Sequence, residues 1–325
     1  IEKVSGSDLV IEAVFEDLKL KHSLYEKIEP HLKEGAILAS NTSTLPITKL
    51  SEVLKDRTRF IGIHFFSPVD KMNLVELIKS EKTSDHSLAV ALDFTTLIKK
   101  TPIVVNDARG FYANRCIIPY INEGLRMLTE GIEPALIENS AKQIGMPVGP
   151  LQLLDELSVS LALNVAKETK EALGEKYEET GTEDILLEMK KKNRLGRKEL
   201  AGFYEYDEKG RRLNLWEGLR DLNVKRMPAD ITTGSVKSRL AYVQALEAAR
   251  SFEEKILLSV EEGDVGGILG WGCLIWAGGP FSWLDHVGHK NVVLECQKLF
   301  DRYGARFAPP RIIKELASNG RKFYN

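Results

Sequence analysis

The stretch IGIHFFSPVDKMNLVELI, from Ile61 to Ile78, decides the fold of this chain. Two runs of apolar and β-forming residues, Arg59–Phe66 and Asn73–Ile78, are separated by the turn signal SPVD. Each run carries one ionisable residue, His64 or Glu76, where a buried strand normally has an aliphatic side chain. If the strands pair, the carboxylate can accept a hydrogen bond from one imidazole nitrogen and leave the other free to take a proton. On spacing alone, a core histidine and a surface glutamate is the commoner alternative.

Further strands are expected on both sides of this stretch, with helical periodicity between them. The runs are Ser7–Val14, Ala36–Ala39 and Pro102–Val105. Alternation of strand and helix predicts an α/β fold with a parallel, doubly wound sheet of the Rossmann type. Ligands of such sheets bind at the carboxyl ends of the strands, where Glu16, Ser43 and His64 fall.

Composition describes an ordinary globular protein. The 325 residues are 43% hydrophobic and 28% charged, with a formal charge of -2. No basic block predicts nucleic-acid binding, and no apolar run reaches the about 18 residues of a membrane span. The three cysteines are far apart, which favours reduced thiols and gives no metal spacing. The chain starts with Ile1 and no signal peptide precedes the first strand, so we expect a piece of a longer protein, with its first mononucleotide half absent.

From Asp107 onward the sequence becomes helical, and Leu151–Leu173 is expected to continue helically. A weak repeat relates Arg115–Leu128 to Arg239–Phe252, and in both copies a Gly-Pro pair precedes an aspartate by five residues. Two such copies could pack face to face, as a dimer does. The glycines of Gly266–Gly272 are interpreted as tight helix packing. The expected domains are 1–106 (partial nucleotide-binding), 107–210 (first helical), 211–232 (linker) and 233–325 (second helical).

Three motifs carry a resemblance to a known family. They are Ser40-Asn41-Thr42-Ser43, His64-Phe65-Phe66-Ser67-Pro68 with Glu76, and Gly110-Phe111-x-x-Asn114-Arg115. In this order and spacing, they make the sequence similar to the L-3-hydroxyacyl-CoA dehydrogenases over essentially the whole chain. It resembles most the dehydrogenase part of the multifunctional fatty-acid β-oxidation enzymes.

The resemblance implies NAD-dependent oxidation of an L-3-hydroxyacyl-CoA to a 3-ketoacyl-CoA. It implies His64 as the general base, oriented by Glu76, with Ser43 and Asn114 on the substrate oxygen. The residues expected at the NAD cofactor are Glu16, Lys21, Ser43 and Ser67. Without the family, helix caps would explain Ser43 and Asn114, and surface charge would explain Glu16 and Lys21.

The sequence departs from the family in three places. Ser67 stands where an asparagine is frequent, Arg109 replaces a proline, and the glycine-rich phosphate loop is absent. Alternatives are therefore a 3-hydroxybutyryl-CoA dehydrogenase and a catalytically silent fragment. Expected partners are an acyl-CoA substrate, an upstream enoyl-CoA hydratase domain in the parent chain and a thiolase subunit, with neither nucleic acid nor a transmembrane segment. A bacterial-type cytoplasm is the expected compartment, and peroxisome and mitochondrion stay open.

Overall fold

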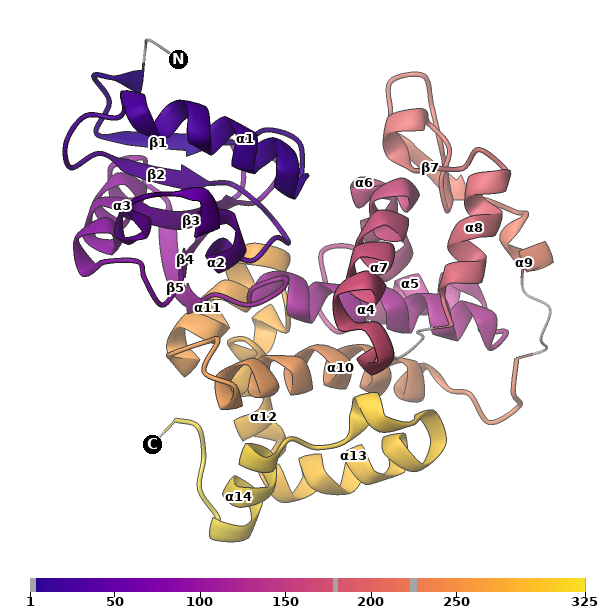
Figure 1. The fold of residues 1–325 in the computed structure, drawn as a ribbon. Helices are drawn as coiled ribbons and strands as arrows, with labels where there is room; N and C mark the ends of the chain where they lie inside the picture. The colour runs from indigo at the N-terminus through magenta and orange to yellow at the C-terminus, as the bar shows by residue number, and fades with distance from the viewer. Residues whose placement is uncertain (1–3, 178–180, 223–226, 325) are drawn as a thin grey trace. The chain divides into compact units, whose positions relative to one another are not determined.

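Five strands pair into one sheet in the order β1-β2-β3-β4-β5 (Figure 1). The structure is a computed structural model, and it describes residues 4–177, 181–222 and 227–324. The strands are β1 (Leu9–Glu12), β2 (Ile37–Ser40), β3 (Phe60–Phe65), β4 (Leu74–Lys79) and β5 (Thr101–Asn106). All five lie at the runs expected from the sequence, so the expected α/β class is confirmed.

The direction of β4 differs from the sequence prediction. The strands β1, β2 and β3 are parallel, as expected, but β4 is antiparallel to β3 and parallel to β5. The sheet is therefore parallel, as predicted, except between β3 and β4, whose antiparallel pairing the sequence prediction did not give. Only residues 66–73 connect β3 to β4, whereas a parallel connection needs a crossover of about a dozen residues or more. A hairpin is what a connection of this length allows.

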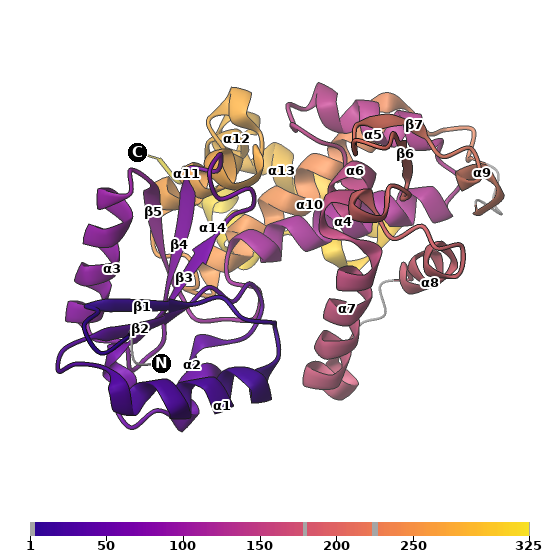
Figure 2. The same ribbon diagram turned by 90° about the horizontal axis from the view of Figure 1, so that it is seen from above.

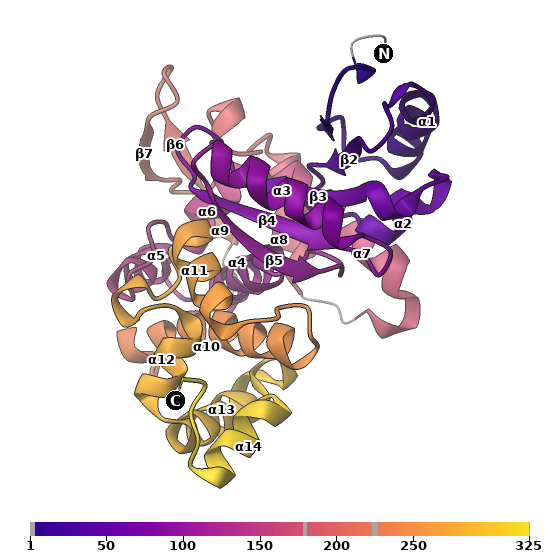
Figure 3. The same cartoon turned by 90° about the vertical axis from the view of Figure 1, so that its left-hand side faces the viewer.

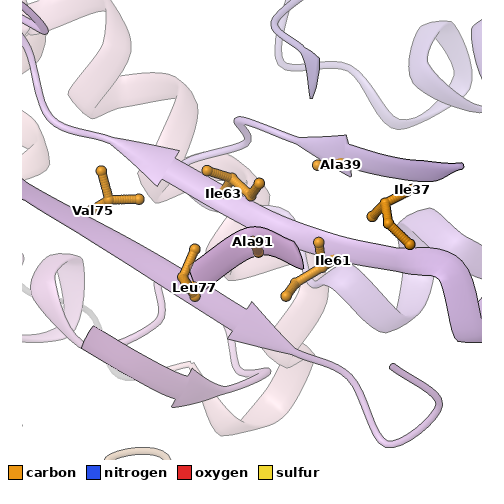
Figure 4. Close-up of a cluster of buried hydrophobic side chains, with 7 residues drawn as sticks. All are labelled: Ile37, Ala39, Ile61, Ile63, Val75, Leu77 and Ala91. Atoms are coloured by element: carbon orange, nitrogen blue, oxygen red, sulfur yellow. The ribbon is translucent and has the colours of Figure 1, made fainter. Parts of the chain in front are cut away.

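Alternation along the strands gives the sheet two different faces. On one face, aliphatic side chains of β2, β3 and β4 pack against Ala91 of helix α3 (Asp85–Leu97) and form a fully buried core (Figure 4). The labelled core residues are Ile37, Ala39, Ile61, Ile63, Val75, Leu77 and Ala91. Because neighbours along a strand point to opposite faces, His64 and Glu76 lie on the other face.

Two units share the chain, and the sheet belongs to the first. That unit holds residues up to 116, 245–295 and those from 309 onward. Helix α3 lies along the core face (Figure 3), and α11 (Val260–Trp271) contacts β4 and β5 on the face that holds His64 (Figure 2). Its remaining helices are α1 (Leu18–Ile28), α2 (Ile47–Leu50), α12 (Pro280–Val287) and α14 (Arg311–Asn319).

Glycines allow α11 to approach the sheet closely. A β-carbon at Gly266 would lie 2.8 Å from Cδ1 of Ile103, and one at Gly270 would lie 2.8 Å from Cδ2 of Leu74. A side chain at either position would require these neighbouring side chains to shift. The interpretation of Gly266–Gly272 as close packing is confirmed.

The second unit, residues 117–244 and 296–308, is mostly helical. Helices α4 (Ala113–Thr129), α10 (Thr233–Glu253) and α13 (His289–Tyr303) belong partly to each unit. The others are α5 (Pro134–Gln143), α6 (Pro150–Leu157), α7 (Val159–Leu173), α8 (Glu183–Lys191) and α9 (Leu219–Leu222). Residues 151–173 are helical as expected, with a break at Ser158, which adopts φ 88° between α6 and α7 and caps α7 with its side chain.

The segment expected as a linker, 211–232, contains regular structure. Strand β7 (Arg212–Leu215) pairs antiparallel with β6 (Tyr204–Tyr206), and α9 follows it. Residues 223–226 of this segment lie outside the described residues, as do 1–3, 178–180 and 325 at other places in the expected domains.

Equivalent hydrogen bonds recur in the two helical copies. Asp155, five residues after Pro150, accepts the backbone N–H groups of Phe203-Tyr204 at 2.7 and 2.9 Å. Asp285, at the same distance after its proline, accepts those of Phe323-Tyr324 at 2.9 and 2.9 Å. In each copy, the aspartate of the sequence repeat therefore binds a Phe-Tyr pair in the same way, which supports the repeat.

The first helix of each copy also supplies an arginine to the other copy. In the first unit, Arg115 of α4 binds two glutamates of α10; in the second unit, Arg239 of α10 binds two glutamates of α4. The pairs are Arg115–Glu247, Arg115–Glu254, Arg239–Glu123 and Arg239–Glu130. Each partner is displaced by the same 124 positions in the sequence, so the pairing is reciprocal, as in an interface between identical subunits.

Candidate active site

His64 and Glu76 lie directly opposite each other on β3 and β4. The imidazole Nδ1 is 2.7 Å from Oε2 of Glu76, and the two residues are 6% and 0% exposed. The contact expected from the sequence is therefore present. With the carboxylate accepting from Nδ1–H, the lone pair lies on Nε2, which suits the ring for taking a proton.

The second oxygen of Glu76 is also occupied. Oε1 accepts the backbone N–H of Tyr112 at 3.2 Å and that of Ala113 at 2.8 Å, where helix α4 begins. These N–H groups lack partners within the helix, and the helix dipole favours a negative charge there. The helix start therefore fixes the orientation of the carboxylate. Sequence reasoning missed these donors, which lie 36 and 37 positions from Glu76.

Two aromatic rings contact the imidazole of His64. The ring centroid of Phe66 lies 4.8 Å from it and that of Phe111 lies 6.0 Å from it. Both phenylalanines are buried. A buried ion-pairing group with apolar neighbours interacts more strongly than an exposed one, because water screens it less.

The polar loop after β2 is organised by Glu16. Its Oε1 accepts the hydroxyl of Thr42 at 2.6 Å and the backbone N–H groups of Ser43 and Thr44 at 3.0 Å each. Burial alone raises the pKa of Glu16, but the Thr42 hydroxyl, the Lys21 ammonium at 3.4 Å and the two N–H groups hold this pKa below its ordinary value. Glu16 therefore shapes the loop from within.

Ser43 and Asn114 are brought together by a direct bond. Nδ2 of Asn114, in the first turn of α4, donates to the carbonyl oxygen of Ser43 at 2.7 Å. In the same loop, Oδ1 of Asn41 accepts the backbone N–H of Phe65, next to His64, at 2.8 Å. The loop is thus tied both to α4 and to the end of β3, and Ser43 itself is exposed.

Lys21 lies in the interior, only 1% exposed. It donates to the buried Glu12 at 2.5 Å, and Glu12 also accepts the hydroxyl groups of Tyr25 and Ser40. Sequence reasoning missed Glu12. The same signal that marked His64, an ionisable residue in an apolar strand, was present in the first strand and could have found it.

Ser67, unlike Lys21 and Glu12, lies at the protein surface. It is exposed on the turn between β3 and β4 and precedes Pro68. Across 4–177, 181–222 and 227–324, no group of three or more His, Cys, Asp or Glu side chains is arranged to hold a metal ion. The three cysteines are free and buried.

Comparisons with known proteins identify the family to which this chain belongs. A family model described as 3-hydroxyacyl-CoA dehydrogenase, NAD binding domain, matches residues 1–108, and the model of the C-terminal domain matches 110–206. The solved (S)-3-hydroxybutyryl-CoA dehydrogenase PaaH1 from Ralstonia eutropha is 37% identical, with a TM-score of 0.59 over 64% of this chain and 73% of that one. This chain belongs to the 3-hydroxyacyl-CoA dehydrogenase family.

Longer members of the family match the second helical copy as well. The fatty acid oxidation complex subunit alpha of Shewanella loihica is 38% identical over 321 residues, which are 99% of this chain and 45% of that protein. The dehydrogenase part of multifunctional enzyme 1 from C. elegans is 29% identical, with a TM-score of 0.67 over 97% of this chain and 73% of that one. The chain thus spans about half the length of the curated relatives it matches.

The family is one of oxidoreductases whose matched first domain binds NAD. Ser43 is exposed and follows β2 at the carboxyl edge of the sheet, beside the strand that carries His64, which is where ligands of such sheets bind. Within the described residues, no helix combines the length and apolar character needed to cross a membrane.

Proposed function

We propose that this chain oxidises the 3-hydroxyl group of an L-3-hydroxyacyl-CoA to a ketone, with His64 as the general base. The observation that carries the proposal is the buried His64–Glu76 pair, in which one carboxylate oxygen meets Nδ1 and the other accepts two backbone N–H groups. This arrangement leaves Nε2 as the proton acceptor. Family membership supplies the substrate class.

The proton step belongs to the protein. Nε2 of His64 takes the hydroxyl proton of the substrate, and Glu76 stabilises the imidazolium that forms. Ser43, through its hydroxyl group, and Asn114, through its side-chain amide, hold the substrate oxygen. Because Asn114 already donates to the Ser43 carbonyl, the same contact sets the position of both.

NAD⁺ supplies the hydride acceptor when it is bound. Ser43 and Ser67 contact the cofactor directly in this proposal, because both are exposed. Glu16 and Lys21 act one step behind them, since their charged atoms are engaged with the loop and with Glu12. Their role is to keep the loop after β2 in a binding conformation.

A second candidate is a 3-hydroxybutyryl-CoA dehydrogenase, because the Ralstonia eutropha relative bears that name. The two candidates share the chemistry of His64 and differ in acyl chain length. Rates with four-carbon and sixteen-carbon substrates separate them.

The parent of this chain is proposed to be the alpha subunit of a fatty-acid oxidation complex, as its Shewanella relatives are named. An enoyl-CoA hydratase domain upstream and a thiolase subunit are the proposed partners, and a bacterial cytoplasm is the proposed compartment. The proposed domains are 1–106, 107–210 and 233–325, with 211–232 between the two helical copies.

The proposal is tested by following NADH formation from L-3-hydroxyacyl-CoA substrates, both with the 325-residue chain and with the parent protein. His64→Gln is expected to lower kcat/KM about 10²–10⁴-fold. His289→Gln is the matched control, because His289 is also buried and paired with a carboxylate, Asp285, at 2.8 Å. Full activity in His64→Gln would show that His64 is not the general base. Activity of the parent alone would mean that the chain is a silent fragment by itself.

A further inference from the structure

Tyr112 connects the catalytic carboxylate to the second helical copy. Its backbone N–H donates to Oε1 of Glu76, and its hydroxyl group donates to the carbonyl oxygen of Gly263 in α11 at 2.9 Å. The side chain is 0% exposed, and its ring meets that of Trp271 edge-on at 5.5 Å. The backbone of this buried residue thus binds Glu76, while its side chain binds α11.

Helix α11 is shaped to receive this side chain. A β-carbon at Gly266 would lie 3.1 Å from Cε1 of Tyr112, so glycine leaves the ring just enough room. One turn further, a β-carbon at Gly270 would lie 3.5 Å from the ring of Phe66, which contacts His64. The same helix therefore lies against Tyr112, whose backbone binds Glu76, and against Phe66, whose ring contacts His64.

Helix α11 and the segment before it are hydrogen-bonded to the outer edge of β5. The backbone N–H of Val104 donates to Oε2 of Glu262 at 3.2 Å, and that of Asn106 donates to the carbonyl oxygen of Ile256 at 2.8 Å. These bonds cover the outer edge of β5, which pairs with the strand of Glu76. A helix held in this way offers Tyr112 a fixed acceptor.

We propose that Tyr112 is a positioning residue, through which α11 of the second helical copy holds the Glu76 carboxylate against His64. The catalytic meaning of this link rests on the proposed function. The second copy, which no matched family model covers, is then part of the support of the active site.

Tyr112→Phe tests the link because it removes one oxygen and keeps the ring. Tyr120→Phe is the matched control: Tyr120 is also 0% exposed, and its hydroxyl group donates to the carbonyl of Val148 at 2.9 Å in the second unit. The main readout is the proton resonance of His64 Nδ1–H in ¹⁵N-histidine-labelled protein, assigned with His64→Gln. It reports the bond to Glu76 and would not respond to a general loss of stability.

Tyr112→Phe should shift or broaden this resonance and lower kcat about three- to tenfold with KM within about twofold, while Tyr120→Phe should leave all three unchanged. Gly266→Ala, which crowds the Tyr112 ring from α11, should move the same resonance. The proposal is overturned if the resonance stays in place in both variants, or if Tyr120→Phe moves it equally. If the wild type has no dehydrogenase activity, the proposed function is refuted. The His64 Nδ1–H resonance in the Tyr112→Phe variant would still test whether Tyr112 positions Glu76.

Discussion

Glu76→Gln probes the site most sharply, because the glutamine amide has only two orientations there. With its oxygen at the Oε1 position, it accepts the N–H groups of Tyr112 and Ala113 as Glu76 does. Its NH₂ group then faces Nδ1 of His64, which must become an acceptor. The ring proton moves to Nε2 and occupies the lone pair that the general base needs.

The opposite orientation is too costly to rescue the base. It would place the NH₂ group against two backbone N–H donors and leave both unsatisfied, at about 1–3 kcal/mol each. The first orientation therefore dominates, and kcat/KM should fall about 10²–10⁴-fold, which corresponds to about 3–5 kcal/mol of activation free energy. Since glutamine has nearly the same shape as glutamate, the fold should be retained.

Initial rates of NADH formation measure the loss, and ¹⁵N shifts of the His64 ring report which nitrogen carries the proton. Glu138→Gln is the control, because Glu138 is 2% exposed and accepts the N–H of Leu151 and the hydroxyl of Tyr204, at 2.9 and 2.7 Å. A Glu76→Gln enzyme within about threefold of wild-type kcat/KM, or one whose proton stays on Nδ1, would refute the orienting role of the carboxylate.

Two further predictions concern stability. The pKa of Glu16 is held below its ordinary value of 4.5 in the folded chain, so its contribution is present above that pH and is lost as the pH falls through the folded value. The difference in the free energy of unfolding between wild type and Glu16→Gln, measured with urea, should therefore shrink in acid; a difference independent of pH would contradict this. Arg239→Gln should cost about 3–5 kcal/mol, because Arg239 and its partner Glu123 are both 0% exposed. Arg115→Gln, at a side chain 19% exposed, should cost about 1 kcal/mol, and equal costs would contradict the role of burial.

Local signals were enough to predict the strands and the central contact. Apolar β-forming runs bounded by turn residues located all five strands, and a short turn between two of them made the contact of His64 with Glu76 plausible from sequence. The same short turn also implied a hairpin. The alternation of strands and helices along the rest of the chain favoured a parallel sheet, and this pattern outweighed the hairpin in the prediction.

Contacts set by chain closure could not be predicted in this way. The donors to Glu76 come from the start of α4, and the acceptor of the Tyr112 hydroxyl lies 151 positions further along. No periodic pattern in the sequence predicts either contact, because each depends on how whole helices pack in the folded chain. Lys21 was expected at the NAD cofactor or on the surface, because its buried partner Glu12, nine positions earlier, was not singled out in the sequence.

The reciprocal arginines have an evolutionary consequence. In a homodimer, a single gene change alters both symmetric halves of the interface at once, so the two halves must remain identical. In this chain each half is encoded separately, and the halves have diverged: the Arg239–Glu123 pair is sealed from solvent, whereas Arg115 and Glu247 keep 19% and 13% of their side-chain surface. Arg115 also follows Asn114 directly in the sequence. Because the two halves are encoded separately, a substitution in one ion pair can change the stability of that half without changing the other.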